Sequence, residues 1–258
     1  MGAEAHFSDE ARRGRLVARQ DLAADASGPV AVARDLVILH SSDPSTPYLS
    51  CAARLEEFAA PDLDEALDEE RALWRLHAMR GTLFIATRDD APDLLAGATR
   101  DIAQAQRRRV EQMVSTAIDS DPGAWLAPIE SQILAALGKH ETLTTTELAA
   151  AVPELGTQVR AGSGRWAHTV PLSSRLLSLM AMDGALVRGR PAGTWRSSQY
   201  AWTSHQAWFD GTLENPDPER SRARIVTRYL ERYGPATLDD IAWWTGWGKR
   251  VASAALAA

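Results

Sequence analysis

The sequence predicts a mainly α-helical protein with small β-hairpin wings, built from tandem modules of one kind. Segments with apolar residues at helical spacing recur along the chain, and two groups of them are followed by paired β-rich runs around a glycine-containing turn. At 258 residues, the chain is long enough for two or three units at roughly 100 to 200 residues each. No run reaches the roughly 18 apolar residues that a membrane helix needs.

The first predicted module covers residues 8–99. It begins with a helix at Ser8, where a capping residue precedes acidic residues and apolar positions at helical spacing. A second helix is predicted over residues 29–40, PVAVARDLVILH, with proline at its first position. After a short helix in PDLDEALDEE, two β-rich runs around Arg80-Gly81 predict a hairpin. Helices followed by a two-stranded hairpin are in the order of a winged helix.

The same order returns in a second module, residues 128–205, after a connecting helix or linker at 100–127. Its three helices are predicted over residues 128–137, 144–152 and 171–182. In the following GALVRGRPAGTWRSSQYAWT, the PAG sequence is expected to turn the chain between two strands. This segment is the clearest candidate wing in the sequence.

A third module is predicted over residues 219–258, after a polar linker at 206–218. It starts with the helix PERSRARIVTRYLERYG and continues with LDDIAWWTG, which Thr237 caps. No hairpin follows the last helical segment, WGKRVASAALAA. We therefore expect the third winged helix to be incomplete, either in a truncated chain or in a naturally short protein.

Charge is distributed unevenly along a chain whose net charge is -6. Eight acids and no lysine lie within residues 56–70, a run typical of a solvated helix face. Residues 156–205 instead carry six arginines against the single acid Asp183. This second region is therefore the one expected to bind a polyanion.

Several classes of protein are excluded by what the sequence lacks. Cys51 is the only cysteine, so an internal disulfide and a multi-cysteine zinc site are excluded, and a buried structural thiol is expected. His140-Glu141 has no second histidine at metalloprotease spacing, and no glycine-rich phosphate loop with lysine occurs. We expect no metal and no nucleotide cofactor. The N-terminal residues show no signal peptide, so a cytoplasmic, nucleoid-associated protein is expected.

Three separated stretches together resemble a known family. LVILHSSDPSTPYLS, AMRGTLFI and RYLERYGPATLDDIAWWTG look like the bacterial tandem winged-helix proteins that include the AlkZ/YcaQ-like DNA glycosylases, and they follow that family's order. The resemblance covers most of the chain. It implies three winged helices that form a C-shaped DNA-binding unit. It also implies cleavage of the N-glycosidic bond of bulky alkylated purines, including interstrand crosslinks.

The resemblance also implies where the catalytic residues lie. The family's motif, Gln-Φ-Gln or Gln-Φ-Asp with an aliphatic Φ, stands just before the Asp-Pro that is Asp43-Pro44 here. His40, Ser41 and Ser42 occupy the three motif positions in this chain. Some relatives carry histidine at the first position, so the main departure is at the third. The candidate catalytic residues are His40, Ser42 and Asp43.

The departure at Ser42 has a chemical consequence. Loss of an alkylated base leaves positive charge on the sugar, so the site must stabilise an oxocarbenium-like centre and orient a water on its far face. The Ser42 hydroxyl carries no charge, and electrostatic help would have to come from Asp43. The imidazole of His40 suits hydrogen bonding to water or phosphate. An alternative interpretation is that Ser41, Ser42 and Asp43 only end a helix and shape a turn.

Basic side chains on the two hairpins and one helix are the candidate DNA contacts. On the second wing, four residues are expected to project together at a hairpin tip and to follow phosphates or the minor groove: Arg188, Arg190, Trp195 and Arg196. Helix 171–182 offers Arg175 as a phosphate contact that positions without specifying sequence. On the first hairpin the candidates are Arg75, His77 and Arg80, although a polar strand face also explains Arg75 and His77. Trp243 and Trp244 are expected in core and helix packing.

Two further interpretations stay open beside a glycosylase. One is a non-catalytic winged-helix protein, either a transcriptional regulator or a lesion sensor, in which the altered motif marks lost chemistry. The other is a protein-interaction module that uses the acidic face of residues 56–70. The favoured partner is double-stranded DNA, including alkylated DNA, bound by a monomer without contact to a membrane.

Overall fold

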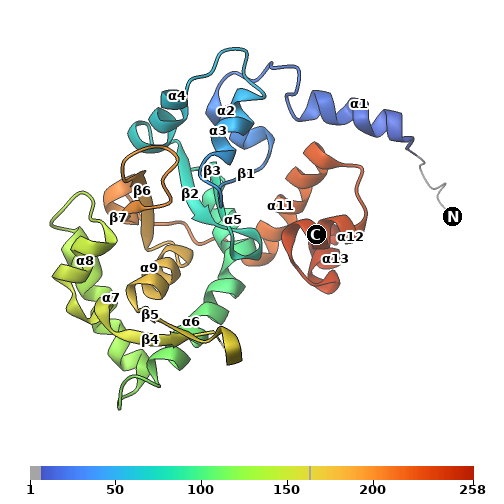
Figure 1. The fold of residues 1–258 in the computed structure, drawn as a ribbon. Helices are drawn as coiled ribbons and strands as arrows, with labels where there is room; N and C mark the ends of the chain where they lie inside the picture. The colour runs from blue at the N-terminus through green and yellow to red at the C-terminus, as the bar shows by residue number, and fades with distance from the viewer. Residues whose placement is uncertain (1–6, 163) are drawn as a thin grey trace.

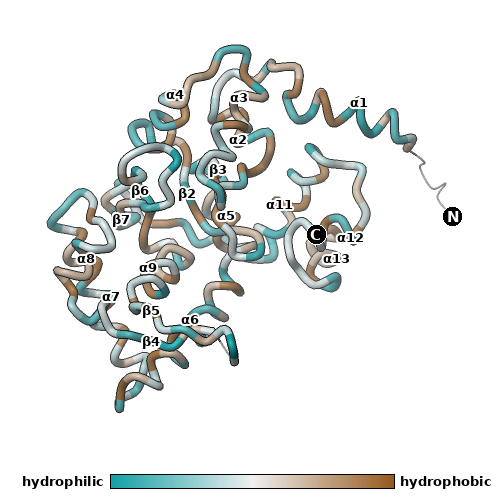
Figure 2. Tube along the Cα trace, viewed as in Figure 1, coloured by the Kyte–Doolittle hydropathy of each residue, from teal (hydrophilic) through white to brown (hydrophobic). Residues whose placement is uncertain are grey.

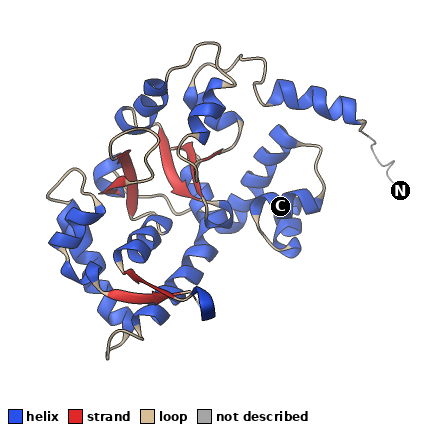
Figure 3. Ribbon diagram, in the orientation of Figure 1, coloured by secondary structure: helices blue, strands red, loops and turns tan. Residues whose placement is uncertain are grey.

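The structure is a computed structural model that describes residues 7–162 and 164–258 (Figure 1). The chain is mainly helical, and in the described residues its strands form three small antiparallel sheets (Figure 3). The predicted fold class, mainly α with small β-hairpins, is confirmed. No helix in these ranges is long and apolar enough to cross a membrane.

The N-terminal part, residues 7–90, packs short helices against a three-stranded sheet of order β1-β3-β2. Its elements are α1 (Asp9–Arg19), α2 (Pro29–Asp35), β1 (Leu39–His40), α3 (Thr46–Ala52), α4 (Ala60–Asp64) with a π-helical turn at Glu65–Glu69, β2 (Leu73–His77) and β3 (Leu83–Thr87). The hairpin predicted around Arg80-Gly81 is confirmed as β2 and β3. Helices followed by a hairpin that pairs with a short first strand have the order of a winged helix.

Helix α1 begins where the sequence predicts, with the Ser8 hydroxyl accepting a hydrogen bond from the Ala11 amide. It buries none of its residues and carries mostly hydrophilic positions (Figure 2). Arg19 at its end donates to the carbonyl oxygen of Gly234 over 3.0 Å. The helix therefore lies at the periphery and contacts the chain through its last turn.

The helix predicted over residues 29–40 is too long. Helix α2 ends at Asp35, Val37 has a positive φ of 68°, and Leu39 and His40 form strand β1 opposite Ile85 and Phe84 of β3. The reason is burial: four consecutive apolar residues, 36–39, are at most 6% exposed. A short run that is buried all round suits a strand between layers as well as a helix, so periodicity alone does not separate the two.

Two composition-based expectations hold in this part. Cys51 is fully buried, and burial raises the pKa of its thiol to about 12, so it is a structural residue. Most acids of the 56–70 run lie at the surface. Asp68 is the exception, being 5% exposed and paired with Arg75.

The central part, residues 91–209, repeats the order of helices and hairpin. Its elements are α5 (Ala91–Leu94), a π-helical turn at Leu95–Thr99, α6 (Arg100–Val114), α7 (Pro122–Leu137), α8 (Thr145–Ala151), β4 (Gln158–Ala161), β5 (His168–Pro171), α9 (Ser173–Met182), β6 (Leu186–Pro191), β7 (Tyr200–Ser204) and α10 (His205–Phe209). Thr144 and Glu147 form the capping box that opens α8. The helix expected from residue 144 and the β6–β7 hairpin are confirmed.

Two features of this part differ from the sequence-based expectation. Helix α7 begins at Pro122 instead of residue 128, because the Asp121 carboxylate caps the amide of Ala124 over 2.7 Å and Pro128 is accommodated inside the helix. The β4–β5 hairpin was not predicted. It stands between α8 and α9 as an addition to the winged-helix order.

The C-terminal part, residues 210–258, holds three helices that follow the prediction closely. They are α11 (Pro218–Tyr233), α12 (Leu238–Thr245) and α13 (Lys249–Ala257), packed around a small core of their own. Thr237 and Asp240 form a capping box at the start of α12. Local signals fix these ends, which explains why the sequence sufficed here.

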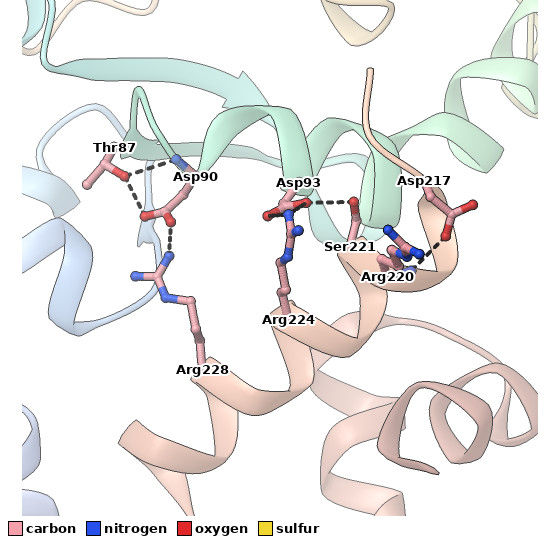
Figure 4. Close-up of polar contacts among 8 residues, drawn as sticks. All are labelled: Thr87, Asp90, Asp93, Asp217, Arg220, Ser221, Arg224 and Arg228. Carbon is pink, nitrogen blue, oxygen red and sulfur yellow. Dashed lines mark hydrogen bonds and ion pairs between the residues drawn. The ribbon is translucent and has the colours of Figure 1, made fainter. Parts of the chain in front are cut away.

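A polar seam joins α11 to α5 (Figure 4). Arg224 pairs with Asp93 at 3.0 Å, the Ser221 hydroxyl donates to the same carboxylate over 2.7 Å, and Arg228 pairs with Asp90. A Cβ on Gly97 would lie 2.9 Å from Ile225 Cδ1, so glycine permits the close approach of the two segments. These contacts hold α11 against α5 and the following π-helical turn.

Candidate active site and nucleic-acid interface

The candidate catalytic residues lie at one end of the three-stranded sheet. His40 is the last residue of β1, and the Ser41 amide donates to the carbonyl oxygen of Leu83 over 2.9 Å. On the other side of β3, Leu83 is opposite His77 of β2. The loop that follows His40 therefore leaves the sheet at the same end as the 78–82 turn of the hairpin.

The three motif positions differ in exposure. Ser41 is 2% exposed, whereas His40 and Ser42 are exposed. The His40 ring meets the edge of Phe84 at a centroid distance of 5.3 Å. Neither His40 nor Ser42 forms a side-chain hydrogen bond within residues 7–162 and 164–258. Both side chains therefore have their polar atoms open to an incoming ligand.

Asp43 is exposed, but its carboxylate is hydrogen-bonded within its own turn. Its Oδ1 accepts hydrogen bonds from the Ser45 amide at 2.8 Å and from the Ser45 hydroxyl. These bonds hold the pKa of the Asp43 carboxyl below its ordinary value, so it is ionised at neutral pH. The turn leads directly into α3. The geometry thus supports a turn-forming role for Asp43 and also leaves a charged carboxylate beside Ser42.

His77 connects the hairpin to the central part of the chain. Its Nδ1–H donates to the Gly81 carbonyl oxygen over 2.9 Å, and its Nε2 accepts from Arg188 over 2.9 Å. A guanidinium only donates, so the imidazole must be neutral with its proton on Nδ1. Burial, reinforced by the charge of Arg188, lowers the pKa of His77 to about 4. His77 therefore supports the turn, and both of its ring nitrogens are already hydrogen-bonded within the protein.

Arg80 stands at the tip of the same turn and reaches the C-terminal helices. Its guanidinium lies over the Trp243 indole, 5.2 Å from the ring centre, and donates to the Trp243 carbonyl oxygen over 3.3 Å. A Cβ on Gly246 would lie 2.6 Å from Arg80 Cγ, so the glycine makes room for this side chain. Trp243 is 73% exposed, so the expectation that it packs in the core is wrong, while Trp244 does pack in the core.

Arg75 is buried and paired with a carboxylate. It is 5% exposed and pairs with the buried carboxylate of Asp68 at 2.9 Å. It also donates to the Gly189 carbonyl oxygen over 3.3 Å. Neither the predicted DNA contact nor the alternative of a polar strand face fits Arg75, because its guanidinium is bonded inside the protein and does not reach the surface.

The four residues of the second wing do not project together. Arg188 is 8% exposed, with its guanidinium 4.7 Å from the Trp202 ring centre. Arg190 pairs with Glu69, and Trp195 packs on Tyr48 of α3 at a ring-centre distance of 4.7 Å. Of the four, Arg196 is the residue that is both exposed and without an ion pair to a described carboxylate.

The shape of the second wing explains this difference. The strands continue to the Pro191–Tyr200 pair after an irregularity beyond Arg188, so PAG does not form a tight turn. The longer loop that results folds back against the N-terminal part, where Trp195 joins the α3 core. The prediction that the β6–β7 hairpin ends in an exposed cluster of basic residues is therefore wrong.

A different basic surface is formed by residues that, apart from Arg175, were not among the predicted DNA contacts. Arg160, Arg165, Trp166 and His168 are exposed on the β4–β5 hairpin, next to Arg175 in the first turn of α9. The signal available in the sequence was the alternation of QVRA and HTVP on either side of GSG. Only Arg175 of this group was among the predicted contacts.

Nothing in the described residues gathers three or more histidine, cysteine, aspartate or glutamate side chains that could hold a metal ion. A hollow of about 490 Å³ lies between α9, α10 and the 211–213 segment, lined by residues such as Gly184, His205 and Leu213. None of the predicted site residues lines it. The candidate catalytic residues instead lie on an open surface at the sheet end.

Comparison with known proteins places this arrangement in a family. A family model described as "DNA glycosylase AlkZ-like" matches residues 33–258. The solved structure of the Streptomyces sahachiroi DNA glycosylase AlkZ superposes with a TM-score of 0.68 at 19% identity, over 98% of this chain and 65% of that one. This chain thus spans about two thirds of the length of that enzyme, and the likeness shows a shared fold.

No curated protein is significantly similar in sequence. The family match begins just before the Leu39–His40 strand and runs through the helices of the C-terminal part. It therefore includes the sheet end, the three hairpins and the α11 seam. The chain belongs to the AlkZ-like DNA glycosylase family.

Proposed function

We propose that this protein binds duplex DNA and hydrolyses the N-glycosidic bond of bulky alkylated or crosslinked purines. The observation that carries the proposal is the sheet end, where the exposed His40 and Ser42 and the ionised Asp43 leave β1 beside the hairpin turn. His40 and Ser42 occupy the first and third motif positions, at which the family resemblance places its catalytic pair, and Asp43 follows them directly. We also propose three winged-helix modules, over residues 8–99, 128–205 and 219–258.

The reaction needs negative charge and an oriented water at the sugar. As the bond between C1′ and the purine nitrogen breaks, its electron pair stays with the base and neutralises the positive charge of the alkylated ring. Positive charge then develops on the sugar until water adds to C1′ and loses a proton. Asp43, ionised at neutral pH, supplies the charge, and His40 holds the water or the adjoining phosphate.

The shortness of Ser42 sets a limit on this chemistry. A hydroxyl contributes no charge to an oxocarbenium-like centre, so Asp43 must act one residue further along the loop. Because Asp43 also accepts from Ser45, its carboxylate has a fixed direction at the start of α3. We therefore propose a weakened catalytic role for Ser42 and Asp43 and a stronger one for His40.

The second candidate function is a DNA-binding protein without catalysis, a regulator or a lesion sensor. The engagement of Asp43 in the turn favours it, because a residue that shapes the loop explains the Asp-Pro sequence without chemistry. Both candidates share duplex DNA as partner. We propose a monomer that acts in the cytoplasm at the nucleoid in either case.

Excision of a bulky N7-alkylguanine from a labelled duplex separates the two candidates. Wild type is compared with His40→Ala, Asp43→Ala and a matched control, His140→Ala, whose side chain is also exposed but lies between α7 and α8. If the protein is a glycosylase, wild type and the His140→Ala control should release the alkylated base. The rate of release should fall at least tenfold in His40→Ala. Equal background release by all four proteins, with duplex binding intact, would establish the non-catalytic alternative.

A further inference from the structure

The β4–β5 hairpin presents one face to solvent and one to the protein. Val159 and Ala161 are at most 3% exposed, whereas Gln158 and Arg160 between them are exposed. Arg160 pairs across the hairpin with Thr169, which is exposed as well. Because successive strand residues alternate between faces, the register fixes Arg160 on the outer face.

The charge of this surface is not neutralised from within. Arg160, Arg165 and Arg175 are exposed and form no ion pair with a carboxylate in the described residues. The sequence contains no aspartate or glutamate from residue 155 to 182. By contrast, Arg190 on the β6–β7 hairpin already pairs with Glu69. The positive charge of the β4–β5 surface is therefore available to an anionic group of another molecule.

Trp166 adds an aromatic surface to the same hairpin. It is 72% exposed, and the Arg165 guanidinium lies 5.1 Å from its ring centre. Large aromatic side chains that stay in water next to arginine are typical of binding surfaces. An indole beside a guanidinium group matches the backbone of DNA, which offers phosphates next to sugars and base edges.

Helix α9 joins this surface to the candidate active site. Arg175 and Ser178 are three residues apart, so they lie on one face of the helix with a rise of about 4.5 Å between them. Ser178 accepts a hydrogen bond from Arg188 over 3.4 Å, and Arg188 in turn holds His77 at the sheet end. Through Ser178, Arg188 and His77, the helix face that carries Arg175 is connected to the sheet end.

We propose that the β4–β5 hairpin, together with Arg175, is the duplex-binding surface of the central part of the chain, in place of the β6–β7 wing. Arg160, Arg165 and Arg175 contact phosphates, and the Trp166 indole packs against a sugar or a base edge. The inference rests on the proposed function because it takes duplex DNA as the partner. It deepens that function by assigning the contact that holds the DNA flanking the lesion.

Titration of a labelled, undamaged 20-base-pair duplex by fluorescence anisotropy, repeated across salt concentrations, tests the surface. Arg160→Ala/Arg165→Ala is compared with a control of equal charge change, Arg12→Ala/Arg13→Ala on the exposed helix α1. Loss of two phosphate contacts predicts that the slope of log K against log salt falls by roughly 1.8 in magnitude. The affinity at low salt should fall at least tenfold, with the control within twofold of wild type.

Substitution of the tryptophan separates stacking from charge. Trp166→Ala is expected to weaken binding roughly fivefold without changing the salt slope, and Trp166→Phe to restore most of the affinity. All the substituted side chains are exposed, so unchanged thermal unfolding shows that the variants are folded.

Two negative results are distinguishable. If wild type binds and Arg160→Ala/Arg165→Ala binds with the affinity and salt slope of the control, this surface is wrong and the proposed function stands. If wild type itself does not bind duplex DNA, the proposed function fails and the inference fails with it.

Discussion

Arg188 of β6 donates a hydrogen bond to Nε2 of His77 over 2.9 Å, across 111 residues of sequence. The other ring nitrogen of His77 donates to Gly81 in the hairpin turn, and Arg80 in that turn reaches Trp243 of α12. One neutral imidazole thus links the central part, the hairpin turn and the C-terminal helices. Its two hydrogen bonds tie the turn to β6 at the end of the sheet from which the candidate catalytic loop leaves.

His77 predicts a loss of stability in acid. Its pKa of about 4 in the folded protein is below the ordinary value of 6.5, so the unfolded chain binds the proton more tightly. Stability from this group is therefore full above pH 6.5 and is lost as pH falls toward 4, by up to about 3 kcal/mol. Urea unfolding at pH 7, 5.5 and 4.5 measures it. His77→Gln, which keeps an acceptor for Arg188, should show a smaller decline, and an equal decline would contradict the assignment.

Arg188→Met tests whether the buried cation is needed for stability. Arg188 has no carboxylate partner, and its Nη1 is buried without a hydrogen bond in the described residues. An apolar side chain of similar length is therefore expected to change the free energy of unfolding by no more than about 1 kcal/mol. It also removes a charge next to His77, so the acid-induced decline should shrink. Duplex affinity should stay as in wild type, and a tenfold loss would show that Arg188 contacts DNA.

Arg75→Ala is expected to destabilise the protein without reporting on DNA. The substitution leaves the Asp68 carboxylate buried without its partner, since the side chains are 4% and 2% exposed. Breaking such a pair costs about 3–5 kcal/mol in the free energy of unfolding. Urea unfolding measures the loss, and Asp68→Leu/Arg75→Met should recover most of it. A loss under 1 kcal/mol in Arg75→Ala would show that the pair is open to water.

Arg80→Gly separates binding from folding at the hairpin turn. Arg80 has a positive φ of 59°, which glycine adopts without strain, so the melting temperature should change little. The guanidinium is lost, and with it the proposed phosphate contact, for which we expect about 1 kcal/mol, or roughly fivefold in duplex affinity. Arg80→Lys keeps the charge and should bind more tightly than Arg80→Gly. Equal affinity of all three proteins would show that Arg80 serves only to hold Trp243.

The helices with local capping signals follow directly from the sequence. Thr144 with Glu147 and Thr237 with Asp240 close their capping boxes within four residues, so no distant part of the chain is needed to place them. The end of α2 could not be placed in the same way. Residues 36–39 became a buried connection and a strand because β3, more than 40 residues later, offered a partner.

The residues of the candidate site likewise separate into those that the sequence places and those that tertiary contacts place. The sequence by itself determined the mainly helical fold with hairpins, the exposed acidic run, and the placing of His40, Ser42 and Asp43 beside a turn. Only the tertiary structure decided which arginines are free. Arg75, Arg188 and Arg190 are occupied by Asp68, His77 and Glu69, whereas Arg160, Arg165 and Arg175 face solvent without a carboxylate. An arginine is paired within the protein or left to solvent depending on neighbours that come from distant segments. Residue type alone does not specify those neighbours.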